Sequence, residues 1–422
     1  MIEKKELMEK TKRFFVGNMV TIVFVALGIL GFIYSGLSLP FFVNELFIRI
    51  TRNSLLVLAL IIPVLAGMGL NFAIVLGAMA GQVAIIVVTH WGIVGVKGFL
   101  LCMLLAVPVA LIFGYLTGSL LNKTKGKEMI ASLILGFFAN GLYQLVFLIF
   151  IGTIIPMQNE VLVLSSGVGL RVTIDLTGGI KYAIDHIWRL TIPWAALSTS
   201  ILTMLYISIK FYLSKTRKTI KQMTTAHLYY FSAAMLLALW SIYIMNTDSL
   251  FNMLRVPIIT VLAILLVCLF TVFIMKTKLG QDLKTVGQDR HIATVAGINS
   301  NKVRLTAIMI STVLAAWGQL FFLQNLGTMS TYGSHEQVGM FSIAALLIGG
   351  ASVSKATIGQ ALLGVVLFHT LFIVSPLAGR NVFGDAQLGE FFRAFVAYGV
   401  IGLSLGMHAW KKQIQARNSL KG

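Results

Sequence analysis

Residues 254–275 read LRVPIITVLAILLVCLFTVFIM, and after Arg255 this stretch contains no charged side chain. A helix needs roughly 20 consecutive apolar residues to cross the hydrocarbon core of a bilayer. The polar segment 276–304 follows directly, with six basic residues. The stretch therefore predicts a membrane-spanning helix that leads into a water-facing loop.

The composition extends this prediction to the whole chain. Of the 422 residues, 58% are hydrophobic and 11% are charged, whereas soluble domains are about a quarter charged. This balance excludes a secreted enzyme, a disordered chain and a disulfide scaffold. We expect an all-α polytopic membrane protein with about 10 to 12 transmembrane helices. The predicted spans lie near 14–36, 54–68, 70–88, 99–121, 129–155, 188–213, 228–245, 254–275, 305–326, 340–350, 358–374 and 391–408.

The net charge of +19 maps the topology rather than a nucleic-acid surface. Of the 33 Lys and Arg residues, 23 lie in five segments: 1–13, 123–127, 210–221, 276–304 and 411–421. These segments fall on one side if the spans alternate, and the positive-inside rule makes that side cytoplasmic. We expect a multi-pass protein of a prokaryotic plasma membrane, with both termini inside and no nucleic-acid partner.

This topology divides the chain into one membrane domain and two tails. We expect residues 1–13 and 411–422 to form cytoplasmic basic tails, and residues 14–410 to form a single transmembrane domain. Within it we expect an outer loop at 152–187, extra spans at 188–250 and a cytoplasmic loop at 276–304.

The polar residues exclude several mechanisms. None of the 14 acidic residues lies in the middle of a predicted span, which argues against an ion-coupled secondary transporter. The only Gly-Lys pair, Gly126-Lys127, is followed by Glu128, so the phosphate-binding pattern of ATPases is missing. The seven His and two Cys residues show no metal-ligand spacing. We expect no catalytic residues, metal or cofactor in this chain.

Two glycine-containing breaks interrupt the apolar runs. GMGLNF (67–72) breaks an early run, and GGAS (349–352) breaks a late one. Paired broken helices in two related halves of a transporter mark a solute path between the halves. A tight cytoplasmic turn is an equal alternative for 349–355.

The polar segment TKLGQDLKTVGQDRHIATVAGIN (277–299) predicts two short helices, because its apolar residues recur at three- to four-residue spacing. Its residues from Gly287 to Ile298 resemble the coupling loop of ATP-binding-cassette (ABC) importer permeases of the ribose, nucleoside and branched-chain amino acid family. That loop carries Gly-x-Asn-x-x-Ala-Ala-x-x-x-Gly-Ile; here Asp289 replaces the Asn and Ile292 the first Ala.

A second match lies at 343–352, which is similar to the late Gly-Gly-x-Ser motif of the same family, although Lys355 stands where the family favours glycine. The segment 67–81 matches more weakly the first broken helix of the family. The resemblance covers residues 54–150 and 254–408 and leaves 152–250 unmatched.

The resemblance implies a pore that works with partners. They are two cytoplasmic ATPases, which hold the ATP and Mg, a second permease of the same or a related kind, and an extracytoplasmic solute-binding protein. The implied ATPase-coupling residues are Gly287, Gln288, Asp289, Arg290, Ala293, Ala296, Gly297 and Ile298.

The candidate solute contacts are polar, aromatic or glycine residues in or near the predicted spans. The absence of charge at the span centres favours an uncharged solute, a simple sugar or a nucleoside. A branched-chain amino acid permease and an ion-coupled transporter remain as alternatives. The candidate residues are Asn71, Phe72, Gln82, Asn140, Gln319, Gly349, Gly350 and Ser352.

Overall fold

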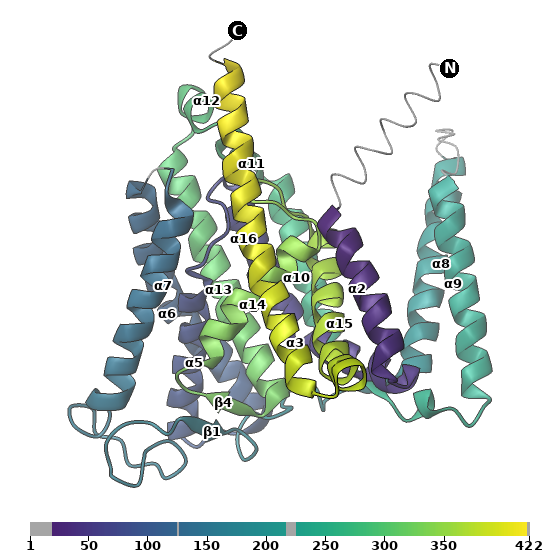
Figure 1. The fold of residues 1–422 in the computed structure, drawn as a ribbon, viewed down its shortest axis with the longest axis horizontal. Coiled ribbons are helices and arrows are strands. Elements are labelled where there is room, and N and C mark those ends of the chain that lie inside the picture. The colour runs from purple at the N-terminus through teal and green to yellow at the C-terminus, as the bar shows by residue number, and fades with distance from the viewer. Residues whose placement is uncertain (1–18, 125, 217–224, 420–422) are drawn as a thin grey trace. The chain divides into compact units, whose positions relative to one another are not determined.

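A computed structural model describes residues 19–124, 126–216 and 225–419 (Figure 1). The predicted tail at 1–13, Lys125, part of the basic loop near Lys218 and the last three residues lie outside these ranges.

Within the described residues, eight helical segments are long and apolar enough to cross a membrane, and two shorter apolar helices accompany them. The prediction of an all-α polytopic membrane protein is confirmed. The long segments are Leu39–Leu65, Gly95–Lys123, Glu128–Phe150, Ile192–Tyr212, His227–Met245, Ile258–Lys276, Ser300–Leu326 and Ile358–Phe383; the shorter helices are Met19–Ser35 and Ile74–His90.

The chain divides into two compact units. The larger unit comprises Met1–Leu37, Arg49–Ile184 and Thr260–Gly422. Its helices are α2 (Met19–Ser35), α4 (Ile61–Leu65), α5 (Ile74–His90), α6 (Gly95–Lys123), α7 (Glu128–Leu145), η1 (Val146–Phe150), α11 (Lys278–Gln288), α12 (Arg290–Val295), α13 (Ser300–Leu326), α14 (Ser334–Ile348), α15 (Ile358–Phe383) and α16 (Ala386–Ser419). Two helices have residues in both units: α3 (Leu39–Ala59) and α10 (Ile258–Lys276).

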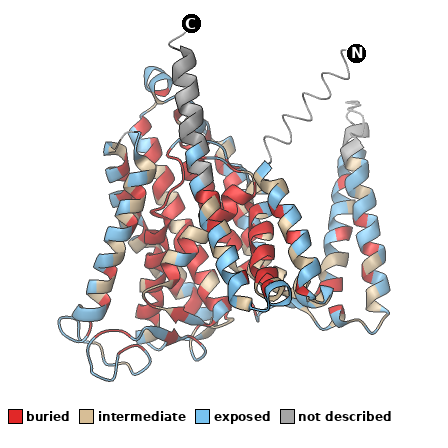
Figure 2. Ribbon diagram, in the orientation of Figure 1, coloured by how far each residue is buried: buried red, intermediate tan, exposed pale blue. Residues whose placement is uncertain are grey.

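The core of the larger unit is built around α5 and α13, whose residues are mostly buried (Figure 2). Their backbones approach closely, because a Cβ atom on Gly77 would lie 2.6 Å from the Thr312 carbonyl oxygen, and one on Gly81 would lie 2.7 Å from that of Ala316. Small residues at this spacing let helices pack tightly in lipid. The many exposed apolar side chains of α6 and α7 suit a lipid-facing surface.

One end of the larger unit is covered by the loop that follows η1. Strand β1 (Thr173–Asp175) belongs to this loop. It pairs antiparallel with β4 (Thr328–Ser330), which follows α13. The Tyr182 amide donates to the Gln324 carbonyl at 2.8 Å, and the Thr331 hydroxyl donates to the Arg171 carbonyl at 2.6 Å. Figure 1 shows this sheet at the end opposite α11, α12 and the C-terminal end of α16.

The smaller unit comprises Ser38–Ile48 and Asp185–Ile259. It contains the hairpin of α8 (Ile192–Thr216) and α9 (Thr225–Met245), the paired strands β2 (Arg189–Thr191) and β3 (Arg255–Pro257), and η2 (Leu250–Asn252). Both hairpin helices are candidate spans, in the region where extra spans were expected.

Helix α3 differs from its predicted boundary. The sequence places the start of this span at Ser54, but the helix begins at Leu39 and contains Arg49 and Arg52. These charges dilute the apolar run, so hydropathy alone hides the first half of the helix. The expectation that no charged side chain lies at a span centre therefore fails at Arg52, in the middle of the span Leu39–Leu65, and the same helix also carries the acidic Glu45.

Candidate functional site

The polar segment 277–299 forms two short helices, as predicted. Thr277 begins α11, where its hydroxyl oxygen accepts from the Gly280 amide. Asp289 caps α12, because its Oδ1 accepts from the amides of Ile292 at 3.0 Å and His291 at 2.7 Å. Both hydrogen bonds, from Ile292 and then His291, lower the pKa of the Asp289 carboxyl. Asn caps helices as well as Asp does, which explains why Asp289 can replace the Asn of the family pattern.

The two faces of this helix pair differ in burial. Leu283, Val286 and Ala293 point into the protein, whereas Ile292 is 61% exposed and Val295 is 77% exposed. Ala293 thus packs within the protein, and Ile292 and Val295 form an exposed apolar pair. Of the remaining predicted coupling residues, Gln288, Asp289, Ala296 and Gly297 are exposed, and Gly287, Arg290 and Ile298 are half-buried.

The C-terminal end of α11 packs backbone to backbone against the early helix break. A Cβ atom on Gly287 would lie 2.1 Å from the Leu65 carbonyl oxygen, and one on Gly67 would lie 2.8 Å from the Gly287 Cα. The break itself matches its prediction, since α4 ends at Leu65 and α5 begins at Ile74, with Gly67 and Gly69 in the left-handed region between them. Only glycine permits this contact, which joins α11 to the broken helix.

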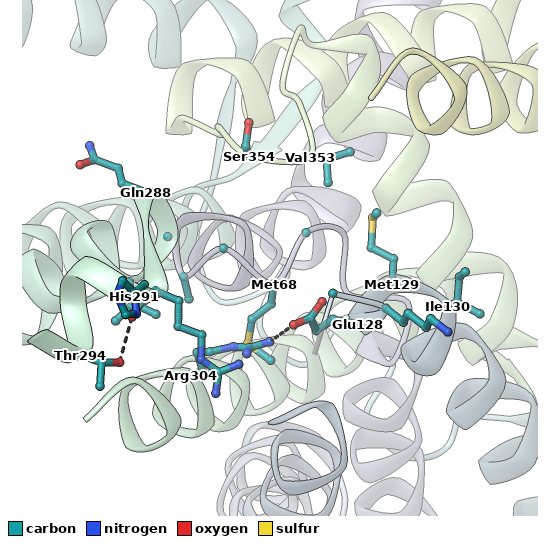
Figure 3. A pocket seen from close by; sticks show the side chains of 18 residues that line it. Met68, Glu128, Met129, Ile130, Gln288, His291, Thr294, Arg304, Val353 and Ser354 are labelled. Atoms are coloured by element: carbon teal, nitrogen blue, oxygen red, sulfur yellow. Dashed lines mark hydrogen bonds and ion pairs between the residues drawn. The ribbon is translucent and has the colours of Figure 1, made fainter. Parts of the chain in front are cut away.

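Around this contact lies a cavity of about 700 Å³ (Figure 3), which we call the coupling cavity. It is lined by residues 66–69 and 126–130, by Arg304, Val353 and Ser354, and by Val286, Gly287, Gln288, Arg290, His291 and Thr294 of the coupling segment. Within it, Arg304 Nη2 lies 2.6 Å from Glu128 Oε1, with both side chains largely buried. This ion pair ties the first turn of α7 to the first turns of α13.

The late break at 349–357 connects α14 to α15 beside the same cavity. The Gly350 carbonyl accepts from Gln360 Nε2 at 2.7 Å, and Ser352 Oγ accepts from the Lys355 amide at 3.1 Å. The structure thus places Gly349, Gly350 and Ser352 in a turn near the coupling segment rather than with the other predicted solute contacts.

A smaller cavity of about 360 Å³, which we call the solute cavity, lies between α5, α7, α14 and α16. Phe72, a predicted contact, lines it, and its backbone amide donates to Ser132 Oγ at 3.1 Å. Asn71 precedes it and is buried, with its Oδ1 bound by the Ala73 amide. The lining residues are Phe72, Val75, Leu133, Gly136, Phe137, Glu336, Gln337, Met340 and Tyr398.

A chain of polar side chains reaches the wall of the solute cavity. His335 Nδ1 lies 2.8 Å from Gln82 Oε1, and His335 Nε2 lies 2.8 Å from Asn140 Oδ1. Asn140 Nδ2 in turn donates to the Glu336 carboxylate. The structure thus brings together the predicted residues Gln82 and Asn140 through a fully buried histidine.

Sequence reasoning missed His335 and Glu336 because they precede the short apolar run at 340–350 and lie outside the predicted spans. The available signal was a titratable pair next to a candidate span. Gln319 is buried in α13 beside Gly81, and it does not line the solute cavity.

Comparison with known proteins shows that the sequence is similar to transport proteins. A family model described as branched-chain amino acid transport system / permease component matches residues 42–401. The chain is 30% identical over 132 residues to the "Probable ABC transporter permease protein YphD" of Escherichia coli, covering 31% of this chain and 40% of the relative.

Two further relatives are named for different substrates. The identity is 28% over 136 residues with the high-affinity branched-chain amino acid transport system permease protein BraD of Pseudomonas aeruginosa, covering 32% of this chain and 39% of BraD. It is 28% over 137 residues with the nucleoside ABC transporter permease protein NupC of Lactococcus lactis, covering 32% and 41%. The chain thus spans about two fifths of the length of these relatives. No solved structure matches it.

Proposed function

We propose, from the premise that this chain belongs to the ABC importer permease family of branched-chain amino acid transport systems, that it forms the pore for ATP-driven uptake of a small uncharged solute. The observation that carries the proposal is the Gly67–Gly287 contact. It joins the coupling segment to a helix break whose far end, at Phe72, lines the solute cavity.

The proposed cycle follows from this connection. ATPase subunits, which hold the ATP and Mg, dock on α11 and α12 through Ile292 and Val295. A rigid movement of α11 displaces the segment 66–72. The two backbones are in direct contact, and no side chain lies between them that could change rotamer and take up the movement. The displacement changes the walls of the solute cavity at Phe72. ATP hydrolysis on the separate ATPase subunits thus drives the opening and closing of the solute cavity in this chain.

The remaining partners complete the importer. A second permease, the same or related, forms the other half of the pore, and an extracytoplasmic binding protein delivers solute to the end that carries β1 and β4. In this orientation we expect both termini to be cytoplasmic, because Lys127, Arg290 and Arg304 lie together at the cavity beside α11 and α12 and mark that end as the basic side.

The walls of the solute cavity favour a simple sugar or a nucleoside. Phe72, Phe137 and Tyr398 offer ring faces, which suit the apolar face of a sugar or a base. The Glu336 carboxylate and the Gln337 amide, which line the cavity, offer acceptors and donors for hydroxyl groups. The relatives are named for a nucleoside, fructose and branched-chain amino acids. A branched-chain amino acid is therefore the second candidate.

Cross-linking in native membranes tests the docking surface. In a Cys268→Ser background, Val295→Cys should form a cross-link to the ATPase subunit with a short bifunctional reagent, because Val295 is exposed on α12. The matched control is Val172→Cys, which is 62% exposed beside β1 at the opposite end. A cross-link from position 172 but not from 295 would reverse the orientation, and none from either would refute docking.

A further inference from the structure

A third cavity, of about 410 Å³, is lined by residues of α3, α13, α14 and α15. We call it the arginine cavity. Arg49 and Arg52 of α3 line it together with His369 of α15, and no acidic residue is among the described residues of its wall. Thr173, Thr328 and Ser330 of the β1–β4 pair border it, which places it toward the end opposite the coupling segment.

The positive charge of this cavity is fixed in place. Arg52 Nε donates to Asn325 Oδ1 at 2.8 Å, and its guanidinium lies 5.9 Å from the centre of the Phe322 ring. A guanidinium stays protonated at every accessible pH. Charged side chains inside a membrane-spanning helix are costly and therefore mark functional sites.

His369 supplies an independent sign of a ligand. Its side chain is only 6% exposed, and its Nδ1 has no hydrogen-bond partner within the described residues. A buried polar atom without a partner is costly. Because His369 also lines the arginine cavity, a ligand atom there would provide the missing partner.

The rest of the wall is aromatic. Phe322, Phe341 and Phe372 line the cavity, and the Phe341 ring centre lies 5.0 Å from that of Phe372. A bare inorganic anion would leave this apolar surface unused. An apolar body attached to the anionic group would bury it.

We propose that the arginine cavity binds a small organic carboxylate. The carboxylate lies between the guanidinium groups of Arg49 and Arg52 and accepts from His369 Nδ1, and the apolar body packs on the phenylalanine rings. The site is separate from the solute cavity, with Gln337 lining both, and so it goes beyond the proposed transport function.

Calorimetry on the purified permease in phosphatidylcholine nanodiscs tests this site with phenylacetate as the probe. Phenylacetate should bind at one site per chain, roughly tenfold or more tighter than phenylacetamide, because hydrogen bonds to a charged acceptor are the stronger ones. Equal binding of the amide, or equally tight binding of inorganic phosphate, would overturn the proposal. So would loss of binding in phosphatidylglycerol nanodiscs, which would assign the cavity to a lipid phosphate.

Matched variants at His369 separate binding from folding. His369→Leu removes the donor and should weaken phenylacetate binding roughly tenfold, whereas His369→Asn keeps a donor near the Nδ1 position and should bind more tightly than the Leu variant. Asn140→Ala, which changes a residue bonded to His335 and outside the arginine cavity, should leave phenylacetate binding unchanged. Unaltered affinity in a folded His369→Leu variant, checked by thermal melting, would contradict the assigned geometry.

Discussion

The ion pair between Arg304 and Glu128 joins α7 to α13 in the wall of the coupling cavity. Its two oppositely charged atoms lie 2.6 Å apart, and the Arg304 side chain is 4% exposed. Glu128→Gln would leave the buried guanidinium uncompensated, at a cost of about 3 kcal/mol in the free energy of unfolding. Thermal melting of the purified variant measures this loss as a lower midpoint temperature.

The pair between Glu390 and Arg393 provides the matched control. It is longer, at 3.2 Å, and the Glu390 side chain is 52% exposed. Glu390→Gln should therefore change stability by less than about 1 kcal/mol. Equal melting shifts in the two variants would show that burial of the Arg304–Glu128 pair does not matter.

Single residues also show the limit of sequence reasoning. The cap at Asp289 follows from local spacing, because its partners are two and three residues away. The partners Glu128 and Arg304 are separated by 176 residues, and no local pattern joins them. The same holds for His335, whose partners Gln82 and Asn140 come from two earlier helices.

At the level of elements, the proposed coupling rests on the joint between α11 and the early helix break. Gly287→Ala would place a Cβ atom 2.1 Å from the Leu65 carbonyl oxygen, so α11 must move away. ATP-driven uptake should fall roughly tenfold, in the range typical of lost coupling. The measurement is uptake in membrane vesicles, with the Val295→Cys cross-link as a readout of intact docking.

A glycine of α15 gives the control for this variant. Gly359 lies in the first turn of α15, and a Cβ atom there would meet nothing within 4 Å. Gly359→Ala should therefore preserve uptake. Normal uptake by Gly287→Ala as well would show that the glycine contact does not transmit the movement.

Periodicity predicts elements where charge and apolar residues separate cleanly. It placed the two short helices of 277–299 and the break at 67–72, because glycine and polar residues punctuate both. It misjudged the start of α3, where Arg49 and Arg52 interrupt an otherwise apolar helix. The arginine cavity was not predicted either, because Arg49 and Arg52 lay outside the predicted span.

At the scale of the whole molecule, composition and basic clusters predicted the polytopic architecture, because the bilayer imposes helix length directly. The sequence did not predict that both helix breaks lie at the same cavity beside α11 and α12. This arrangement depends on how α4, α11 and the 349–357 turn meet, and no spacing along the chain records that meeting.

The most direct test of an ATP-driven pore is uptake by vesicles that contain the permease, its co-purified ATPase and its binding protein. Labelled ribose, adenosine and leucine serve as the solutes. Uptake of one of them should require ATP and persist when an uncoupler collapses the proton gradient at constant ATP. Uptake that does not require ATP, or that collapses with the uncoupler while ATP is held constant, would contradict an ATP-driven importer.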